Sequence, residues 1–232
     1  MDREKNMISI CTPSRGRPEK CAAMIQSMID TKTSDNELEF NIYLNSDDEK
    51  LNEYKKLIDK KYLNIGENYF SNHGWNLMAE KAGGHILFMQ GDAEIMQTSG
   101  WDKIAENEFL TFPKRIGVLV PDDGRGKGGA PHFMVSRQWY ELMGYMSHPI
   151  FLHWHVDTYI MEIAKAAGVL KRINIINKAK KIISDNTAKL SRDNKITNRD
   201  QFVMQWARQH LIPIEKEKIE RAINGQRFIR KN

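Results

Sequence analysis

Short apolar runs alternate with longer amphipathic stretches along most of this chain. The apolar runs are only about four to seven residues long, which is the length of buried strands, whereas the stretches between them carry apolar residues at helical spacing. This alternation predicts βαβ units around a mostly parallel sheet. The predicted strands are Met7–Cys11, Leu38–Leu44, Tyr62–Ile65, Ile86–Met89, Ile116–Val120, His132–Ser136 and Ile173–Ile176.

Helix boundaries are marked by residues that favour a start or a stop. Pro18 suits a first helical turn, and the Gly83-Gly84 pair is typical of a helix end. The predicted helices are Pro18–Asp30, Glu49–Lys60, Ser71–Ala82, Trp101–Leu110, Arg137–Gly144, His153–Ala167, Asn198–His210 and Ile214–Asn224.

Composition is that of a soluble globular protein. The chain has 232 residues, of which 41% are apolar and 28% charged, enough for one domain with an appendage. No apolar run approaches the roughly 20 residues that span a bilayer, and the charged start MDREKNM does not resemble a signal peptide. We therefore expect a cytoplasmic protein with no membrane partner. Cys11 and Cys21 are expected to be buried thiols without a disulfide.

Charge is distributed unevenly along the chain. Residues 171–232 hold sixteen Lys and Arg against six Asp and Glu, a balance of +10, which leaves the first 170 residues at −5 because the whole chain is +5. A basic C-terminal quarter suggests a polyanionic partner. A solvated helical tail explains the same charges equally well.

Two carboxylates follow the strand Ile86–Met89, in the stretch QGDAE. Open α/β sheets bind ligands at the carboxyl ends of their strands, and residues two apart in extended chain point to one side. Asp92 and Glu94 are therefore candidates to share a divalent cation with a diphosphate. The alternative is an ordinary solvated loop.

The first strand is followed by TPSRGRP, which combines hydroxyl groups, two guanidinium groups and a helix start. These groups suit a nucleotide, although the segment is neither a Walker A loop nor GxGxxG. A plain surface turn is the alternative. After the second strand, NSDD could bind a uracil or a ribose, or could simply cap the next helix. Asn76 is expected to face the same side as these groups.

A third candidate region is HWHVD at the start of a predicted helix. His153 and Asp157 are four apart and would share a helix face. Asp157 could serve as a general base, or could instead favour the positive end of the helix; the histidines could pack in the core. The glycine-rich loop DDGRGKGGAP could close over a ligand.

Taken in order, these segments resemble the GT-A-type glycosyltransferases with a family-2-like layout, and most closely the small members found in bacteriophages. The resemblance rests on TPSRGRP, NSDDEKLNEY, GWNLMAEKAGGHILFMQGDAE, GWD, GGAPHFMVSRQWYELMGY and HWHVDTYIMEIAKAAG, which cover most of residues 7–170. It implies a GT-A (Rossmann-like) α/β domain over residues 1–176, with a basic helical C-terminal extension, residues 177–232, packed on the same domain.

The resemblance also implies a role for each candidate residue. Asp157 would be the catalytic base of an inverting enzyme. Asp92 and Glu94 would stand at the DxD position, holding Mn²⁺ or Mg²⁺ against the diphosphate of a nucleotide-sugar, with a UDP-sugar expected first. His132, His153 and Trp154 would belong to the acceptor side or to a lid. The residues expected around the nucleotide-sugar are Thr12, Pro13, Arg15, Arg17, Asn45, Asp47, Asn76, Gly91 and Asp92.

The chain departs from the family pattern at three positions. Ala93 interrupts the usual pair of aspartates, Asn45 replaces an aspartate, and Asn177 stands where a late metal-binding histidine is expected. His132, His153 or His155 could complete the metal site instead.

The segment SDNTAKLSRDNK resembles the tail that wraps over the active site in phage members. Because phages glycosylate hydroxymethylated pyrimidines, double-stranded DNA is the first acceptor to consider, in the host cytoplasm if the protein is phage-encoded. Trp139, Tyr140, Tyr145 or Trp154 could stack on an extruded base, although aromatic residues at these spacings more often pack in the core. A glycan or protein acceptor, a nucleotidyltransferase, and a non-catalytic nucleic-acid-binding protein remain alternatives. The oligomeric state is not predicted.

Overall fold

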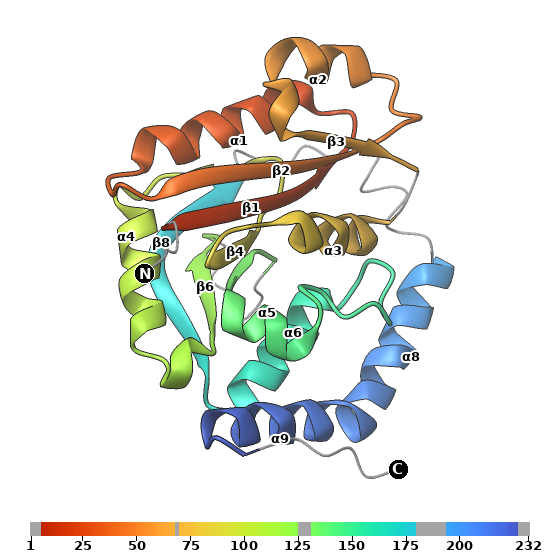
Figure 1. Cartoon of the computed structure of the whole chain (residues 1–232). Coiled ribbons are helices and arrows are strands. Elements are labelled where there is room, and N and C mark those ends of the chain that lie inside the picture. The colour runs from red at the N-terminus through yellow and green to blue at the C-terminus, as the bar shows by residue number, and fades with distance from the viewer. Residues whose placement is uncertain (1–5, 68–69, 125–130, 180–193, 227–232) are drawn as a thin grey trace.

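A single sheet organises the molecule (Figure 1). The structure is a computed structural model that describes residues 6–67, 70–124, 131–179 and 194–226. In these residues the strand order is β3-β2-β1-β4-β7-β6-β8-β5. The strands are β1 (Met7–Ser14), β2 (Glu37–Asn45), β3 (Leu63–Gly66), β4 (Ile86–Met89), β5 (Glu94–Met96), β6 (Val118–Asp122), β7 (Phe133–Ser136) and β8 (Leu170–Ala179).

The sheet is parallel in its first half and mixed in its second. Strands β3, β2, β1 and β4 are parallel neighbours, which confirms the βαβ prediction for this part. Strand β7 then runs antiparallel to both β4 and β6. Strand β8 pairs in parallel with β6 along its first half, and its end, Asn177–Ala179, pairs antiparallel with β5. One long strand therefore connects the main sheet to the short strand that follows Asp92.

Helices cover both faces of the first four strands. Figure 1 shows α1 and α2 on one side of β1 and β2, and α3 on the other. The remaining helices pack around the second half of the sheet. The helices are α1 (Pro18–Thr31), α2 (Leu51–Leu57), α3 (Ser71–Lys81), α4 (Trp101–Leu110), α5 (Arg137–Met143), α6 (Val156–Ala166), α8 (Asn194–His210) and α9 (Ile212–Ile223), with short 3-10 turns at Lys60–Tyr62 and Pro113–Arg115.

The core lies between the sheet and these helices. Strand residues such as Ile10 and Phe88 are fully buried, as are Cys11 and Cys21, whose thiols are free as predicted. Burial of this apolar surface is the main force that stabilises the arrangement. Trp139 and Tyr145 are also buried, which places these two aromatic residues in the core, the second of the two roles considered for them.

The C-terminal helices pack on the helices that precede them. Helix α9 packs against α6 and α5, and α8 follows the outer side of α6, where Arg208 forms hydrogen bonds to both carboxylate oxygens of Glu162. Within the described residues, no helix is long and apolar enough to cross a membrane. The glycine-rich part of DDGRGKGGAP (residues 125–130) and most of SDNTAKLSRDNK (184–193) lie outside the described residues.

Most predicted elements are found, with two differences that affect the candidate site. Strand β5 was not predicted, because only three residues take part and its partner β8 lies far along the chain. Helix α6 begins at Val156, so His153 precedes the helix and does not share a helix face with Asp157, contrary to the prediction.

Candidate active site at the carboxyl ends of three strands

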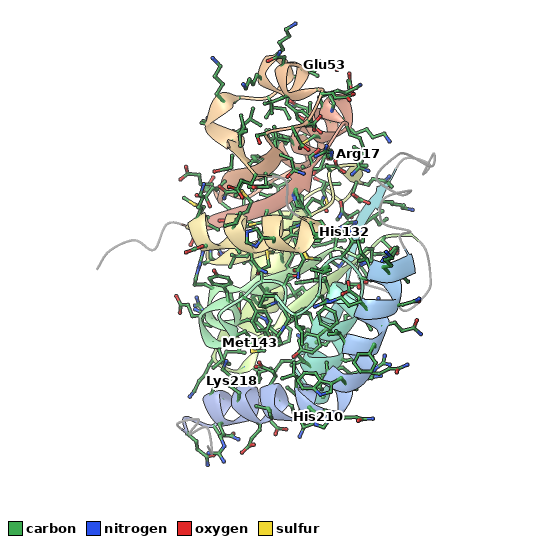
Figure 2. All side chains as sticks on the ribbon, turned by 90° about the vertical axis from the view of Figure 1, so that its right-hand side faces the viewer. Arg17, Glu53, His132, Met143, His210 and Lys218 are labelled. Carbon is green, nitrogen blue, oxygen red and sulfur yellow. The ribbon has the colours of Figure 1, made fainter. Side chains whose placement is uncertain are left out.

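The loops that leave β1, β2 and β4 meet at one edge of the sheet. These three strands are parallel, so their carboxyl ends lie together, where the ligands of such sheets bind. Figure 2 shows Arg17 below α2, which carries Glu53, and above His132. The predicted site residues of the first loop and of the QGDAE segment are therefore brought to one edge.

The first two loops are tied to each other by charge and by backbone bonds. Arg15 donates two hydrogen bonds to the carboxylate of Asp47, at 2.6 and 3.2 Å. Next to it, the backbone N–H of Gly16 donates to Asp48 at 2.8 Å. Gly16 has φ of +68°, a conformation that costs glycine less than other residues. The pair Arg15–Asp47 is partly exposed, so an incoming ligand can reach it.

A buried hydroxyl relay connects the first loop to Asp92. The backbone N–H of Arg17 donates to the Tyr54 hydroxyl at 2.9 Å, which lies 2.6 Å from Ser14 Oγ. Ser14 Oγ in turn donates to Asp92 Oδ2 at 2.6 Å. Because Tyr54 accepts from a backbone N–H, its own proton is available for Ser14, and each hydroxyl donates toward the carboxylate.

Asp92 is also paired with Arg17. Arg17 Nε lies 2.9 Å from Asp92 Oδ2, and the carboxylate is almost fully buried. Burial raises the pKa of Asp92 above its ordinary value, while Arg17 and the Ser14 hydroxyl act in the opposite direction. The proximity of Glu94 adds to the increase. Positive charge at this edge therefore favours the ionised form of Asp92.

Glu94 lies on the other side of the same loop, against His132. Glu94 Oε1 is 2.9 Å from His132 Nε2, close enough for an ion pair, although neither ring nitrogen is in hydrogen-bonding geometry with a neighbour. Gly91 allows this arrangement, because a Cβ there would lie 2.6 Å from His132 Cε1 and still closer to Glu94 Oε2. The predicted position Gly91 thus requires a residue without a side chain.

Asp92 and Glu94 do not form a complete metal cage. Within the described residues, no group of three or more His, Cys, Asp or Glu side chains is arranged to hold a metal ion. Mg²⁺ is commonly held by one or two carboxylates plus substrate phosphates and water. The two carboxylates, with the His132 imidazole beside Glu94, fit a cation that a diphosphate helps to hold, and they do not fit a metal bound by protein alone.

Asn177 has a structural role beneath this loop. Its side-chain amide exchanges two hydrogen bonds with Gln90, at 2.9 and 2.7 Å, and both residues are buried. Gln90 Oε1 also accepts from the backbone N–H of Gly91. The residue at the place of the expected late histidine therefore anchors the loop that carries Asp92.

Asp157 lies in the first turn of α6 and is half-buried. Among the described residues, no hydrogen bond or ion pair joins it to Asp92 or Glu94, and its carboxylate contacts only the neighbouring Thr158 hydroxyl at 3.4 Å. His153 bonds through Nδ1 to Ser71 Oγ at 2.8 Å, and burial lowers its pKa. Trp154 is partly exposed beside it. These residues form a second group, which lies at the start of α6.

The structure corrects several predicted nucleotide contacts. Asn76 uses its amide within the protein, donating to the Ser147 carbonyl at 2.6 Å and accepting from the N–H groups of Met146 and Ser147, so it holds a loop and does not face the site. Thr12 is fully buried and its hydroxyl has no hydrogen-bond partner in the described part of the chain, and Pro13 packs against α3.

Asn45 is buried at the end of β2, where its carbonyl accepts from the Asp48 N–H. Ser14 and Asp48 belong to the predicted segments TPSRGRP and NSDD, whereas Tyr54 was predicted only as an apolar helix residue. The aromatic ring of Tyr54 fits an apolar helix stripe, and only its hydroxyl could have indicated the relay.

Comparisons with known proteins identify the fold. No family model matches the sequence, and no curated protein matches it significantly. Among solved structures, the mannosyltransferase PcManGT from Pyrobaculum calidifontis, in complex with GDP-Man and Mn²⁺, is similar with a TM-score of 0.56 and 12% identity, covering 95% of this chain and 74% of that one. The 1-349 fragment of S. aureus TarS in complex with UDP-GlcNAc is similar with a TM-score of 0.53 and 13% identity, covering 78% of this chain.

This chain covers only 60% of the length of the TarS fragment. The similarity to these two structures confirms the predicted GT-A-like α/β fold. Membership of the bacteriophage subfamily stays a prediction.

Proposed function

We propose that this protein is a glycosyltransferase that moves a sugar from a nucleotide-sugar donor to an acceptor hydroxyl. The observation that carries the proposal is the meeting of Arg15, Arg17 and Asp92 at the carboxyl ends of β1, β2 and β4. Two guanidinium groups and a buried carboxylate at the ligand-binding edge of a GT-A-like sheet suit a nucleoside diphosphate. That PcManGT and TarS were crystallised with GDP-Man and UDP-GlcNAc supports this donor class.

In this proposal the first group of residues binds the donor. Arg15 and Asp47 lie at the exposed side and would contact the nucleoside, with Asn45 below them. Arg17 would reach the diphosphate, while Ser14, itself hydrogen-bonded to Tyr54, orients the carboxylate of Asp92. Asp92 and Glu94 would hold Mn²⁺ or Mg²⁺ together with the diphosphate, and the metal would offset the negative charge on the departing group.

Asp157 is the proposed general base. It would take the proton from the acceptor hydroxyl as that oxygen attacks the anomeric carbon of the sugar. The bond between the anomeric carbon and the diphosphate oxygen breaks in the same step, and the nucleoside diphosphate leaves with the electron pair. A single displacement of this kind inverts the anomeric centre. His153 and Trp154, beside Asp157 in sequence, would contact the acceptor, and His132 would remain with Glu94.

Donor turnover tests the proposal. Wild type with Mn²⁺ should release nucleoside diphosphate from a UDP-sugar or GDP-sugar, and Asp92→Asn should lower the rate by roughly a hundredfold or more. Asp102→Asn is the matched control, since Asp102 is an equally buried carboxylate that holds Thr33 and Ser34 at the opposite end of β2. Release of pyrophosphate would instead identify a nucleotidyltransferase.

Absence of turnover with every common donor would overturn the proposal and favour a non-catalytic binding protein. In that case Arg17 would neutralise Asp92 for stability alone.

Modified double-stranded DNA is the first acceptor that we propose to test, with a glycan or a protein as the alternative. The support is the +10 balance of residues 171–232, since phosphate contacts give salt-dependent affinity. Replacing Lys180, Lys181, Lys189 and Arg192 by Gln should weaken duplex binding and flatten its salt dependence. The control replaces four exposed lysines in the first half of the chain: Lys55, Lys56, Lys60 and Lys61. Equal effects of the two sets would remove the case for a DNA acceptor.

A further inference from the structure

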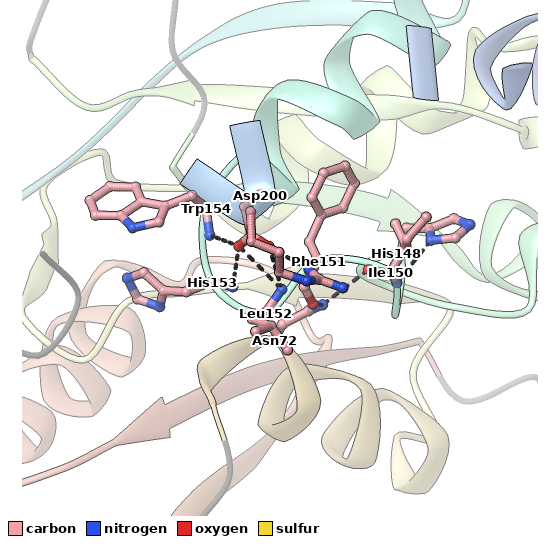
Figure 3. A network of polar contacts seen from close by, with 9 residues as sticks. Asn72, His148, Ile150, Phe151, Leu152, His153, Trp154 and Asp200 are labelled. Carbon is pink, nitrogen blue, oxygen red and sulfur yellow. Dashed lines mark hydrogen bonds and ion pairs between the residues drawn. The ribbon is translucent and has the colours of Figure 1, made fainter. Parts of the chain in front are cut away.

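A buried carboxylate on α8 gathers three successive backbone N–H groups. Asp200 is fully buried, and its side chain accepts from the N–H of His153 and of Trp154, each at 2.9 Å. The N–H of Leu152 lies 3.2 Å from both carboxylate oxygens. Figure 3 shows these bonds converging on Asp200. Arg199, the preceding residue, donates to the same carboxylate at 2.5 Å.

The same segment is held from its other side by α3. Asn72 donates to the carbonyl of His148 at 3.0 Å and to that of Phe151 (Figure 3). Asn76 bonds to the backbone of residues 146 and 147. Residues 146–154 are thus fixed between two amides of α3 and one carboxylate of α8.

This segment leads directly into the first turn of α6. His155 follows Trp154 with φ of +63°, a left-handed conformation that is unfavourable for a residue other than glycine and persists only when the surroundings impose it. Asp157 comes two residues later. The bonds to Asp200 fix the three residues immediately before this strained position, so they set the direction in which the chain enters α6.

We propose that Asp200 is a positioning residue, whose carboxylate fixes residues 152–155 and thereby the orientation of Asp157 and Trp154 toward the acceptor. The inference rests on the proposed function, because it assigns Asp200 a role in the transfer through Asp157. Asp200 itself touches neither donor nor acceptor. Its position on α8 also gives the C-terminal extension a part in the reaction.

An amide cannot replace this carboxylate well. All the bonds to Asp200 come from N–H donors, so the chain needs acceptor atoms on both branches of the side chain. In Asp200→Asn one branch becomes an NH₂ group, which would face backbone N–H groups. The variant is nearly isosteric and should fold, but residues 152–154 should lose their fixed position.

Hydrolysis of the donor with Mn²⁺, in which water takes the place of the acceptor, tests the inference. We expect kcat of Asp200→Asn to fall by roughly 10- to 100-fold, as misplaced catalytic groups do. KM for the donor and Kd for UDP or GDP should change less than about twofold, because the donor contacts lie on β1, β2 and β4. Hydrogen exchange at the N–H groups of residues 152–154 should become faster.

Asp102→Asn is the matched control. Asp102 holds the N–H groups of Thr33 and Ser34 in the same manner, away from the proposed site. The Asp102→Asn variant should speed hydrogen exchange at the N–H groups of residues 33 and 34 and leave kcat unchanged. Asp200→Glu, which keeps the charge and the acceptor atoms, should recover part of kcat. If Asp200→Asn does not fold, Asp200→Glu serves as the test variant in its place. It should then show an intermediate loss of kcat and an unchanged Kd for UDP or GDP.

The outcomes separate the two proposals. Wild-type turnover that Asp200→Asn leaves unchanged overturns the inference alone, and so does an equal loss of kcat in Asp102→Asn. A parallel loss of nucleotide affinity also overturns it, since the residue would then act on the donor. A wild type that turns over no donor overturns the proposed function and, with it, this role of Asp200.

Discussion

Arg17 and Asp92, 75 positions apart in the sequence, form an ion pair with Nε 2.9 Å from Oδ2. Ser14 donates to the same oxygen. Both bonds therefore converge on the same carboxylate oxygen. A cation held by Asp92 would share this carboxylate with the guanidinium group of Arg17, so the diphosphate of a donor would meet two positive charges at once.

Removing one partner of this pair should destabilise the protein. Arg17→Ala leaves a buried carboxylate without its main countercharge, and we expect a loss of about 3 kcal/mol in the free energy of unfolding. The double variant Arg17→Ala/Asp92→Asn should lose clearly less than the sum of the single variants. Urea denaturation measures all three.

Arg15→Ala serves as the control, because its partner Asp47 is exposed and such pairs contribute at most about 1 kcal/mol. Equal losses for Arg15→Ala and Arg17→Ala would contradict the role of burial.

Metal binding should depend on the nucleotide. Since the described residues supply no complete metal cage, Mn²⁺ alone should bind weakly, and UDP or GDP should increase its affinity by roughly tenfold or more. Isothermal titration of Mn²⁺ with and without nucleotide measures this coupling. Glu94→Gln should reduce the coupling, and tight binding of Mn²⁺ without nucleotide would show that the two carboxylates do not act as we propose.

Gly91→Ala should displace the Glu94–His132 pair. The new Cβ would overlap Glu94 Oε2 and lie 2.6 Å from His132 Cε1, and we expect a cost of roughly 1–3 kcal/mol together with weaker Mn²⁺ binding in the presence of nucleotide. Gly83→Ala is the control, because a Cβ there has only ordinary contacts, the nearest at 3.6 Å. Thermal denaturation and the same titration compare the two. Wild-type behaviour of Gly91→Ala would mean that the loop has room that the structure does not show.

Stability should fall as pH decreases from about 6.5 to about 4. Burial among Tyr145, Phe151 and Tyr159, with Lys218 nearby, lowers the pKa of His148 from 6.5 to about 4. The folded protein therefore keeps His148 neutral where the unfolded chain binds a proton, so the stability that is present above pH 6.5 is lost through this window.

The slope from one such group is at most about 1.4 kcal/mol per pH unit. His148→Asn keeps an acceptor for the Ile150 N–H and should flatten the decline, as measured by urea denaturation at several pH values. A variant with the full wild-type slope would assign the decline to other groups.

The first half of the fold could be predicted from sequence because its signals are local. Each strand there is a distinct apolar run, and Pro18 and the Gly83-Gly84 pair mark helix ends. Strand β5 has three residues and depends on a partner some 80 positions away, so no local pattern indicates it. The start of α6 was misplaced for a similar reason, because the segment before it is held by Asp200 from another helix.

In the candidate site, too, some residues could be predicted from local sequence and others depend on distant partners. Arg15, Arg17, Asp47 and Asp92 were predicted from the polar residues that follow each strand, and the structure brings them together. The amide of Asn76 has the same sequence appearance, yet it bonds to a loop about 70 residues away. Whether a polar side chain serves the ligand or the fold depends on such distant partners, which spacing does not encode.

The reciprocal amide bonds between Gln90 and Asn177 have a consequence for the order of events on the ribosome. The end of β4 leaves the exit tunnel many residues before Asn177 is synthesised. A nascent chain of that length already carries every side chain that we propose binds the donor. It still lacks the hydrogen bonds from Asn177 that hold Gln90 and, through it, Gly91. Ribosome-stalled chains that end before β8 should not bind a nucleotide. Nucleotide binding should appear only in chains long enough to include β8.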